Sequence, residues 1–198
     1  MAAKPERRDA ALLYVELRNF TRLSEVLQPD KVLELANEFF SMASRAAVAG
    51  AGNVIAVHND SLLASFAQGD ARQYNEAALN TAQAIRGQFG SVGERWQKEY
   101  GLAAAVSLGL HTGEAVFGMA GALGAQQFVV FGDCVSVAER LVHRARAGEI
   151  VISIDVMKAL GNAVQALGAQ ELPALELGGK RRPLPIYGLL LETRLDFT

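Results

Sequence analysis

Short apolar runs alternate along the chain with longer segments in which apolar residues recur at helical spacing. The short runs are bounded by charged or turn-forming residues, which is typical of buried strands. They cover residues 10–17, 53–57, 61–66, 102–110, 127–131 and 149–154, with an extension at 114–118 and weaker runs within 164–177 and 184–191. Helical spacing predicts helices from Pro29 to the glycines at 50–52, over 75–88 and 96–100, from Gly132 to Ala145, and over 156–160.

The order of these elements indicates the fold class. The first six read β-α-β-β-α-β, and a β-α-β segment and a C-terminal appendage follow. The connection His58-Asn59-Asp60 joins two short apolar runs and is typical of a hairpin turn. We therefore predict an α+β protein with a ferredoxin-like βαββαβ core and additional strands and helices, rather than a doubly wound sheet.

Composition narrows the classes of protein. Apolar residues make up 51% of 198 residues, which indicates one globular domain with a substantial core. The net charge of −2, with mixed signs, argues against a nucleic-acid partner. No apolar stretch is long enough to span a membrane, and the charged N-terminus does not read as a signal peptide. Cys134 is the only cysteine, which excludes an intrachain disulfide and suits a cytoplasmic protein.

The domain boundaries are expected near the two ends of the chain. Residues 1–9 form a charged segment that we interpret as the stub of a linker to an upstream sensor domain. Residues 10–192 form the domain, and residues 193–198 form a C-terminal tail.

Five segments in order carry a family resemblance. They are VELRNFTRLSE at 15–25, HNDSLLASF at 58–66, GLHTGEAVFG at 109–118, FGDCVSVAERL at 131–141, and the segment 179–187. Together they resemble the class III adenylyl/guanylyl cyclase catalytic domain, over residues 10 to 190. The resemblance implies attack of a ribose 3′-oxygen on the α-phosphate of a nucleoside triphosphate, with two Mg²⁺ or Mn²⁺ ions on carboxylates.

The implied metal positions are Asp60 and Glu16. Glu16 stands where the family has an aspartate, and its extra methylene moves the carboxylate away from that position. Asp60 is alternatively an ordinary hairpin residue, and Glu16 an exposed glutamate that faces solvent at a strand end.

The resemblance places a phosphate cradle at Phe20 and Thr21, where the chain turns into a helix. The alternative is a simple helix cap by Asn19 or Thr21. The family's phosphate-holding lysine falls on Gly178, and Lys180, two residues away, is the substitute candidate; a solvated basic turn is the alternative.

The residues at the base-recognition positions differ most from the family pattern. The two polar positions that read the purine are Ala56 and Val129 here, and a site built on hydrogen bonds loses discrimination without them. The alternative is that both are ordinary core-facing strand residues.

The family uses two residues to stabilise the transition state, and one of the two is retained here. Arg140 matches the arginine that stabilises the phosphate, whereas Ser136 replaces an asparagine one helical turn earlier. Alternatively, Arg140 forms a salt bridge across an interface. By resemblance, the metal carboxylates come from one chain and this helix from the other, so we expect a head-to-tail homodimer.

Three functions follow, in order of preference. The first is a degenerate cyclase homology domain that serves in dimerisation or nucleotide binding, without a metal cofactor. The second is a weak cyclase, dependent on Mg²⁺ or Mn²⁺, with relaxed nucleotide choice. The third is a ferredoxin-like interaction domain without a nucleotide site. We further expect His111 and Cys134 to be packed structural residues rather than a ligand and a redox thiol.

Overall fold

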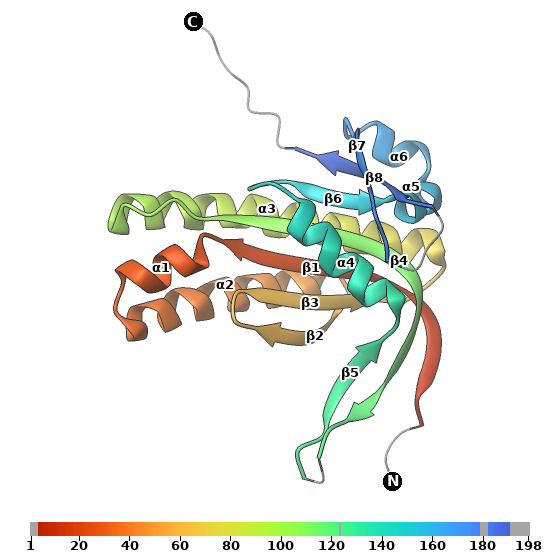
Figure 1. Ribbon diagram of the computed structural model, residues 1–198, viewed down its shortest axis with the longest axis horizontal. Coiled ribbons are helices and arrows are strands. Elements are labelled where there is room, and N and C mark those ends of the chain that lie inside the picture. The colour runs from red at the N-terminus through yellow and green to blue at the C-terminus, as the bar shows by residue number, and fades with distance from the viewer. Residues whose placement is uncertain (1–3, 123, 179–181, 191–198) are drawn as a thin grey trace, which may run out of the picture.

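A mixed β-sheet forms the centre of the structure, a computed structural model that describes residues 4–122, 124–178 and 182–190. Within these residues the sheet has eight strands; seven follow the order β2-β3-β1-β4-β6-β8-β7, and β5 pairs with β4 (Figure 1). The strands are β1 (Glu6–Arg18), β2 (Asn53–His58), β3 (Ser61–Phe66), β4 (Ala105–Ala120), β5 (Gln127–Phe131), β6 (Ile150–Ser153), β7 (Gln170–Leu175) and β8 (Leu184–Leu189).

The first four strands form the predicted ferredoxin-like core. They lie in the order β2-β3-β1-β4 with antiparallel neighbours. Helices connect β1 to β2 and β3 to β4, which gives the βαββαβ sequence of elements. β6 joins the other side of β4 in parallel, and β8 and β7 extend the sheet. The predicted fold class is confirmed.

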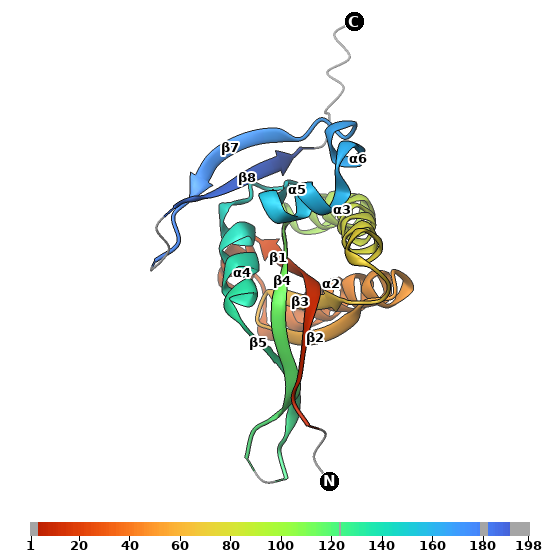
Figure 2. The same cartoon turned by 90° about the vertical axis from the view of Figure 1, so that its right-hand side faces the viewer.

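Helices cover both faces of the sheet. They are α1 (Phe20–Val26), α2 (Pro29–Ala49), α3 (Ala71–Tyr100), α4 (Asp133–Arg144), α5 (Ile154–Leu160) and α6 (Asn162–Gln165). Figure 2 shows α2 and α3 on one side of the sheet and α4 on the other. Alternation along β1 explains this arrangement, because Val15 and Leu17 belong to the core under α2 and α3, whereas Ala10 and Leu12 belong to the cluster under α4.

Helix α3 is one helix of 30 residues, and it covers the predicted helical region, in which residues 75–88 and 96–100 carry the helical spacing. Asp70 begins it with a capping box, because the Asp70 side chain accepts from the Gln73 backbone and the Gln73 side chain accepts from the Asp70 backbone. Phe89 and Trp96 are both buried and pack edge to face, 5.5 Å between ring centroids. This packing spans the stretch between residues 88 and 96, which contains Gly90 and Gly93 and is helical in the structure.

Strands β1 and β4 are also longer than predicted. β1 begins at Glu6 instead of Ala10, and β4 continues through His111-Thr112-Gly113 without a break. The two strands pair along thirteen residues, from Glu6 opposite Phe117 to Arg18 opposite Ala105, so each satisfies the backbone of the other. Beyond this ladder, β4 and β5 project together away from the rest of the sheet (Figure 1).

The described part of the chain contains no helix that combines the length and the apolar character needed to cross a membrane.

Candidate functional site

A polar cavity of about 420 Å³ lies where β1 ends and α1 begins. Strand pairing builds it, because Glu16 lies opposite Ser61 and thereby sets the β2–β3 turn beside the end of β1. The Leu17 backbone N–H donates to the Asp60 carbonyl, 2.8 Å away, and fixes this turn. The cavity thus brings together four predicted site residues and their neighbours: Glu16, Leu17, Arg18, Asn19, Phe20, Thr21, Arg22, Glu25 and Asp60.

The backbone turns sharply at the start of α1. Asn19 has φ 66°, in the left-handed region that asparagine tolerates, and α1 begins at the next residue. No side chain caps the helix, and the Asn19 amide instead donates to the Ala103 carbonyl at 2.8 Å. The alternative in which Asn19 or Thr21 caps the helix is therefore wrong. Phe20 and Thr21 lie at the cavity, as predicted for a phosphate cradle.

Glu16 is not the solvent-facing glutamate that the alternative predicted, because its side chain is only 14% exposed. The Arg18 guanidinium lies 3.2 Å from one carboxylate oxygen, and His143 Nε2 lies 3.4 Å from the other. Both oxygens of Glu16 therefore already have partners with cationic or donor character.

The fit of two divalent cations depends on which carboxylates are available in this cavity. Among the described residues, no group of three or more His, Cys, Asp or Glu side chains is placed to hold a metal ion. Asp60 lines the cavity, and its carboxylate forms no ion pair with another described residue. Glu16 is engaged by Arg18 and His143, so the side chains as arranged do not fit a pair of cations.

A second cavity, of about 340 Å³, contains both predicted base-recognition positions. Ala56 is exposed and Val129 is half-buried, so the alternative that they face the core is wrong. They point outward because their neighbours Ile55 and Val130 alternate to the inner side and pack under α4. The cavity is lined by Ile55, Ala56, Val57, Leu63, Gln127, Phe128, Val129, Val130 and Phe131, of which Gln127 alone has a polar side chain.

The predicted transition-state pair lies on α4. Ser136 and Arg140 are both exposed and one helical turn apart. Neither lines the 420 Å³ cavity that contains Glu16 and Asp60 of the same chain. Arg140 Nη1 donates to the Glu176 carbonyl at 3.3 Å, so in this chain its partner is a backbone oxygen rather than an acidic side chain. Gly178 is exposed, and Lys180 lies outside the described residues.

Comparison with known proteins identifies the family of this chain. The family described as Adenylate and Guanylate cyclase catalytic domain matches residues 3–189. The chain belongs to this family. The predicted resemblance is confirmed at this level, and the domain is a nucleotidyl cyclase domain of the kind used in cyclic nucleotide signalling.

A curated relative supports this assignment, and solved structures show the same fold. "Adenylate cyclase 1" of Rhizobium meliloti (strain 1021) is 31% identical over 137 residues, which are 68% of this chain but only 20% of that relative. The crystal structure of the adenylyl cyclase CyaB from P. aeruginosa superposes with a TM-score of 0.87 at 23% identity, over 97% of this chain and 98% of that one. The guanylate cyclase domain of RhGC from Catenaria anguillulae, solved in complex with GTP, gives a TM-score of 0.79 at 19% identity, over 94% and 98% of the two chains.

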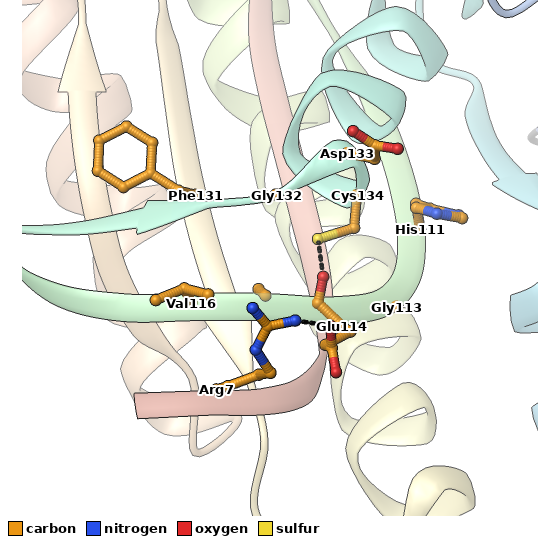
Figure 3. Close-up of a pocket in the computed structure, with 10 residues that line it drawn as sticks. Arg7, His111, Gly113, Glu114, Val116, Phe131, Gly132, Asp133 and Cys134 are labelled. Carbon is orange, nitrogen blue, oxygen red and sulfur yellow. Dashed lines mark hydrogen bonds and ion pairs between the residues drawn. The ribbon is translucent and has the colours of Figure 1, made fainter. Parts of the chain in front are cut away.

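A third cavity of the cyclase domain, of about 460 Å³, is lined by His111 and Cys134 (Figure 3). His111 is buried, and its Nδ1 lies 2.8 Å from the Ser153 hydroxyl. The Cys134 thiol is buried and donates to the Glu114 carbonyl at 3.1 Å. Burial raises the pKa of this thiol, and the backbone N–H groups at the start of α4 only partly offset that effect. Both side chains are therefore buried and packed, as expected, while the absence of a ligand or redox role stays a prediction.

Two residues that line the cavities of the cyclase domain, and one residue that contacts Glu16, escaped prediction. Arg18 and Gln127 each lie two residues from a predicted position on the same strand, so alternation would have placed them on the same face as Glu16 and Val129. His143 meets Glu16 only because α4 packs across β1, and nothing in the local sequence indicates that contact.

Proposed function

We propose that this cyclase domain is catalytically degenerate and serves in cyclic nucleotide signalling as a dimerisation or nucleotide-binding module, working as a head-to-tail homodimer. The observation that carries the proposal is the cavity at Ala56 and Val129. Both polar base readers expected from the family are replaced there by aliphatic side chains. A site that reads a base by hydrogen bonds loses large factors in discrimination when its polar groups are removed.

Two further departures act in the same direction. Ser136 offers a short hydroxyl where the family has an amide, and one lost preorganised contact of this kind typically costs about 10²–10³ in rate. The Glu16 carboxylate is occupied by Arg18 and His143. Even partly additive losses of this size leave little turnover.

The homodimer is proposed from the position of Arg140 and from the apolar surface near it. Arg140 and Ser136 are exposed and lie apart from the cavity of Glu16 and Asp60. A second chain placed head to tail would bring its own α4 to that cavity. The β4–β5 hairpin also exposes large apolar side chains that a partner would cover: Met119, Phe128 and Phe131.

A second candidate function is a working cyclase of low rate and relaxed nucleotide choice. It is favoured by Gln127, because an amide group both donates and accepts hydrogen bonds and suits either adenine or guanine. Asp60, Arg140 and the turn at Phe20 and Thr21 are all retained. The Catenaria relative was solved with GTP, which supports a nucleoside triphosphate as the ligand to test here.

The deciding experiment is a product assay on the purified domain. It is incubated at high concentration with ATP, and separately with GTP, in the presence of Mn²⁺, and 3′,5′-cyclic product is sought by mass spectrometry. Asp60→Asn and Arg140→Ala serve as controls, and sedimentation velocity reports the dimer. We expect a dimer and no product above the controls; product that disappears in both variants would establish the second candidate instead.

Calorimetry with ATP and with GTP tests the remaining alternative, which is an interaction domain without a nucleotide site. Saturable binding excludes it, whereas no binding by a folded dimer favours it. The chain spans about a fifth of the length of the Rhizobium relative, and the proposal includes an upstream sensor domain or a regulatory protein as partner. We also propose a cytoplasmic location, which the single cysteine suits.

A further inference from the structure

An arginine and a histidine of the same chain contact the two oxygens of the Glu16 carboxylate. Arg18 Nη1 lies 3.2 Å from Oε1, and His143 Nε2 lies 3.4 Å from Oε2. The Glu16 side chain is 14% exposed and that of Arg18 is 29% exposed, so solvent screens the pair only partly. Glu16 and Arg18 are two residues apart on β1 and therefore share the strand face that lies under α4, whose last turn carries His143.

Arg18 is held in this position by groups other than Glu16. Its Nε donates to the Ser107 hydroxyl at 2.6 Å, and its Nη2 donates to the Ala145 carbonyl. Ser107 is fully buried and donates in turn to the Arg146 carbonyl at 2.9 Å. The guanidinium is thus fixed by three separate donations and cannot leave Glu16 without giving up those to Ser107 and Ala145.

A divalent cation on Glu16 would meet this fixed positive charge. It would have to displace the guanidinium from Oε1 or lie close beside it, and like charges at such distances repel strongly in a partly buried site. Removing Glu16 from Arg18 would also leave a half-buried charge without its acidic partner. Asp60, across the same cavity, has no ion-pair partner among the described residues and is free of this conflict.

We propose that Glu16 is not a cation ligand in this chain but the acidic member of a fixed cluster with Arg18 and His143. The side chains of the cavity therefore offer one divalent-cation position, at Asp60, instead of two. Arg18 supplies a permanent positive charge in place of the second cation. The inference does not depend on nucleotide binding, because it concerns the affinity of the protein for the metal alone.

The test is a titration of the purified domain with Mn²⁺, in which electron paramagnetic resonance measures the concentration of free Mn²⁺. Arg18→Met releases the Glu16 carboxylate and is expected to tighten Mn²⁺ binding by about tenfold, the size of effect seen when groups beside metal ligands are changed. Adding Glu16→Gln to Arg18→Met should abolish this gain. As a single change, Glu16→Gln should leave Mn²⁺ binding unchanged, whereas Asp60→Asn alone should weaken it.

Arg22→Met is the matched control, because Arg22 lines the same cavity but is exposed and pairs only loosely with Glu25, at 3.6 Å. It removes one positive charge without releasing Glu16, so it should give a smaller gain than Arg18→Met. The proposal is overturned if the two gains are equal, or if Glu16→Gln weakens wild-type binding as much as Asp60→Asn does. If circular dichroism shows that Arg18→Met does not fold, the comparison of Glu16→Gln with Asp60→Asn, each as a single change, decides the proposal: equal weakening of Mn²⁺ binding by both overturns it.

Discussion

Gly109 of β4 lies so close to Val142 of α4 that a Cβ at position 109 would stand 2.4 Å from the Val142 backbone nitrogen. The same Cβ would stand 2.6 Å from the Ala138 carbonyl oxygen. These are backbone atoms and cannot rotate away, so any larger residue pushes α4 off the sheet. Because α4 carries Arg140 and His143, this contact sets the position of the predicted transition-state arginine and of the histidine that contacts Glu16.

We predict that Gly109→Ala lowers the free energy of unfolding by about 1–3 kcal/mol, the usual cost of overpacking. Urea denaturation measures the loss. Gly87→Ala is the matched control, since nothing lies within 4 Å of the Cβ it adds in α3. That change should leave stability equal or raise it by up to about 1 kcal/mol, through higher helix propensity. Equal destabilisation by both variants would contradict the close contact.

A second prediction concerns Gln127, the polar side chain of the Ala56–Val129 cavity. If the cavity receives a purine base, Gln127→Leu should weaken binding of ATP and of GTP by about three- to tenfold, the value of one or two net hydrogen bonds. Calorimetry on the purified domain provides the measurement. Binding of inorganic tripolyphosphate should not change, because it has no base.

Gln126→Leu is the control for that experiment, since Gln126 is the exposed neighbour and does not line the cavity. It should leave nucleotide affinity at the wild-type value. A loss of affinity that is equal in both variants, or that extends to tripolyphosphate, would mean that Gln127 does not contact the base.

The order of the elements could be predicted because each one carries a local signal. The residues of β3 form an apolar run after the turn at Asn59 and Asp60, and Pro29 stands at the first position of α2. The stretch between residues 88 and 96 within α3 is helical although it carries no such signal. Gly93 is needed there because a Cβ would stand 2.8 Å from the Ala104 carbonyl oxygen, so this glycine serves close packing and not a turn.

The gathering of Glu16, Asp60, Phe20 and Thr21 into one cavity followed from motif order, but the state of Glu16 did not. Its exposure and its two partners depend on how α4 crosses β1, a contact between residues 127 positions apart in the case of Glu16 and His143. Single-strand alternation likewise could not tell whether Ala56 and Val129 face the core or the outside, since both faces of these strands carry apolar residues.

The proposed dimer gives a third prediction. Phe131 at the end of β5 is 62% exposed and lines the cavity that contains Val129. A charge at this position would have to be desolvated in an interface, so Phe131→Glu should weaken the dimer at least tenfold in sedimentation equilibrium. Val48→Glu is the control, because Val48 is equally exposed, at 65%, but lies on α2 on the other side of the sheet. A dimer that survives Phe131→Glu unchanged would place the interface elsewhere.

The last prediction follows from two acidic groups whose pKa values are both raised. Burial raises the pKa of the Cys134 thiol, and burial together with the nearby charge of Glu139 raises that of the Tyr14 hydroxyl. In the unfolded chain both groups lose their protons at their ordinary pKa values, while in the folded chain they still hold them.

Above about pH 9 the folded state therefore binds more protons than the unfolded state, and the free energy of unfolding must fall as pH rises. Below that pH both states hold these protons, and the two groups contribute no slope. Urea denaturation between pH 7 and pH 10.5 measures the effect. Cys134→Ala should flatten the first part of the decline and Tyr14→Phe the later part, because thiols ionise before phenols. A wild-type stability that stays level or rises over this range would contradict the buried, neutral state of both groups.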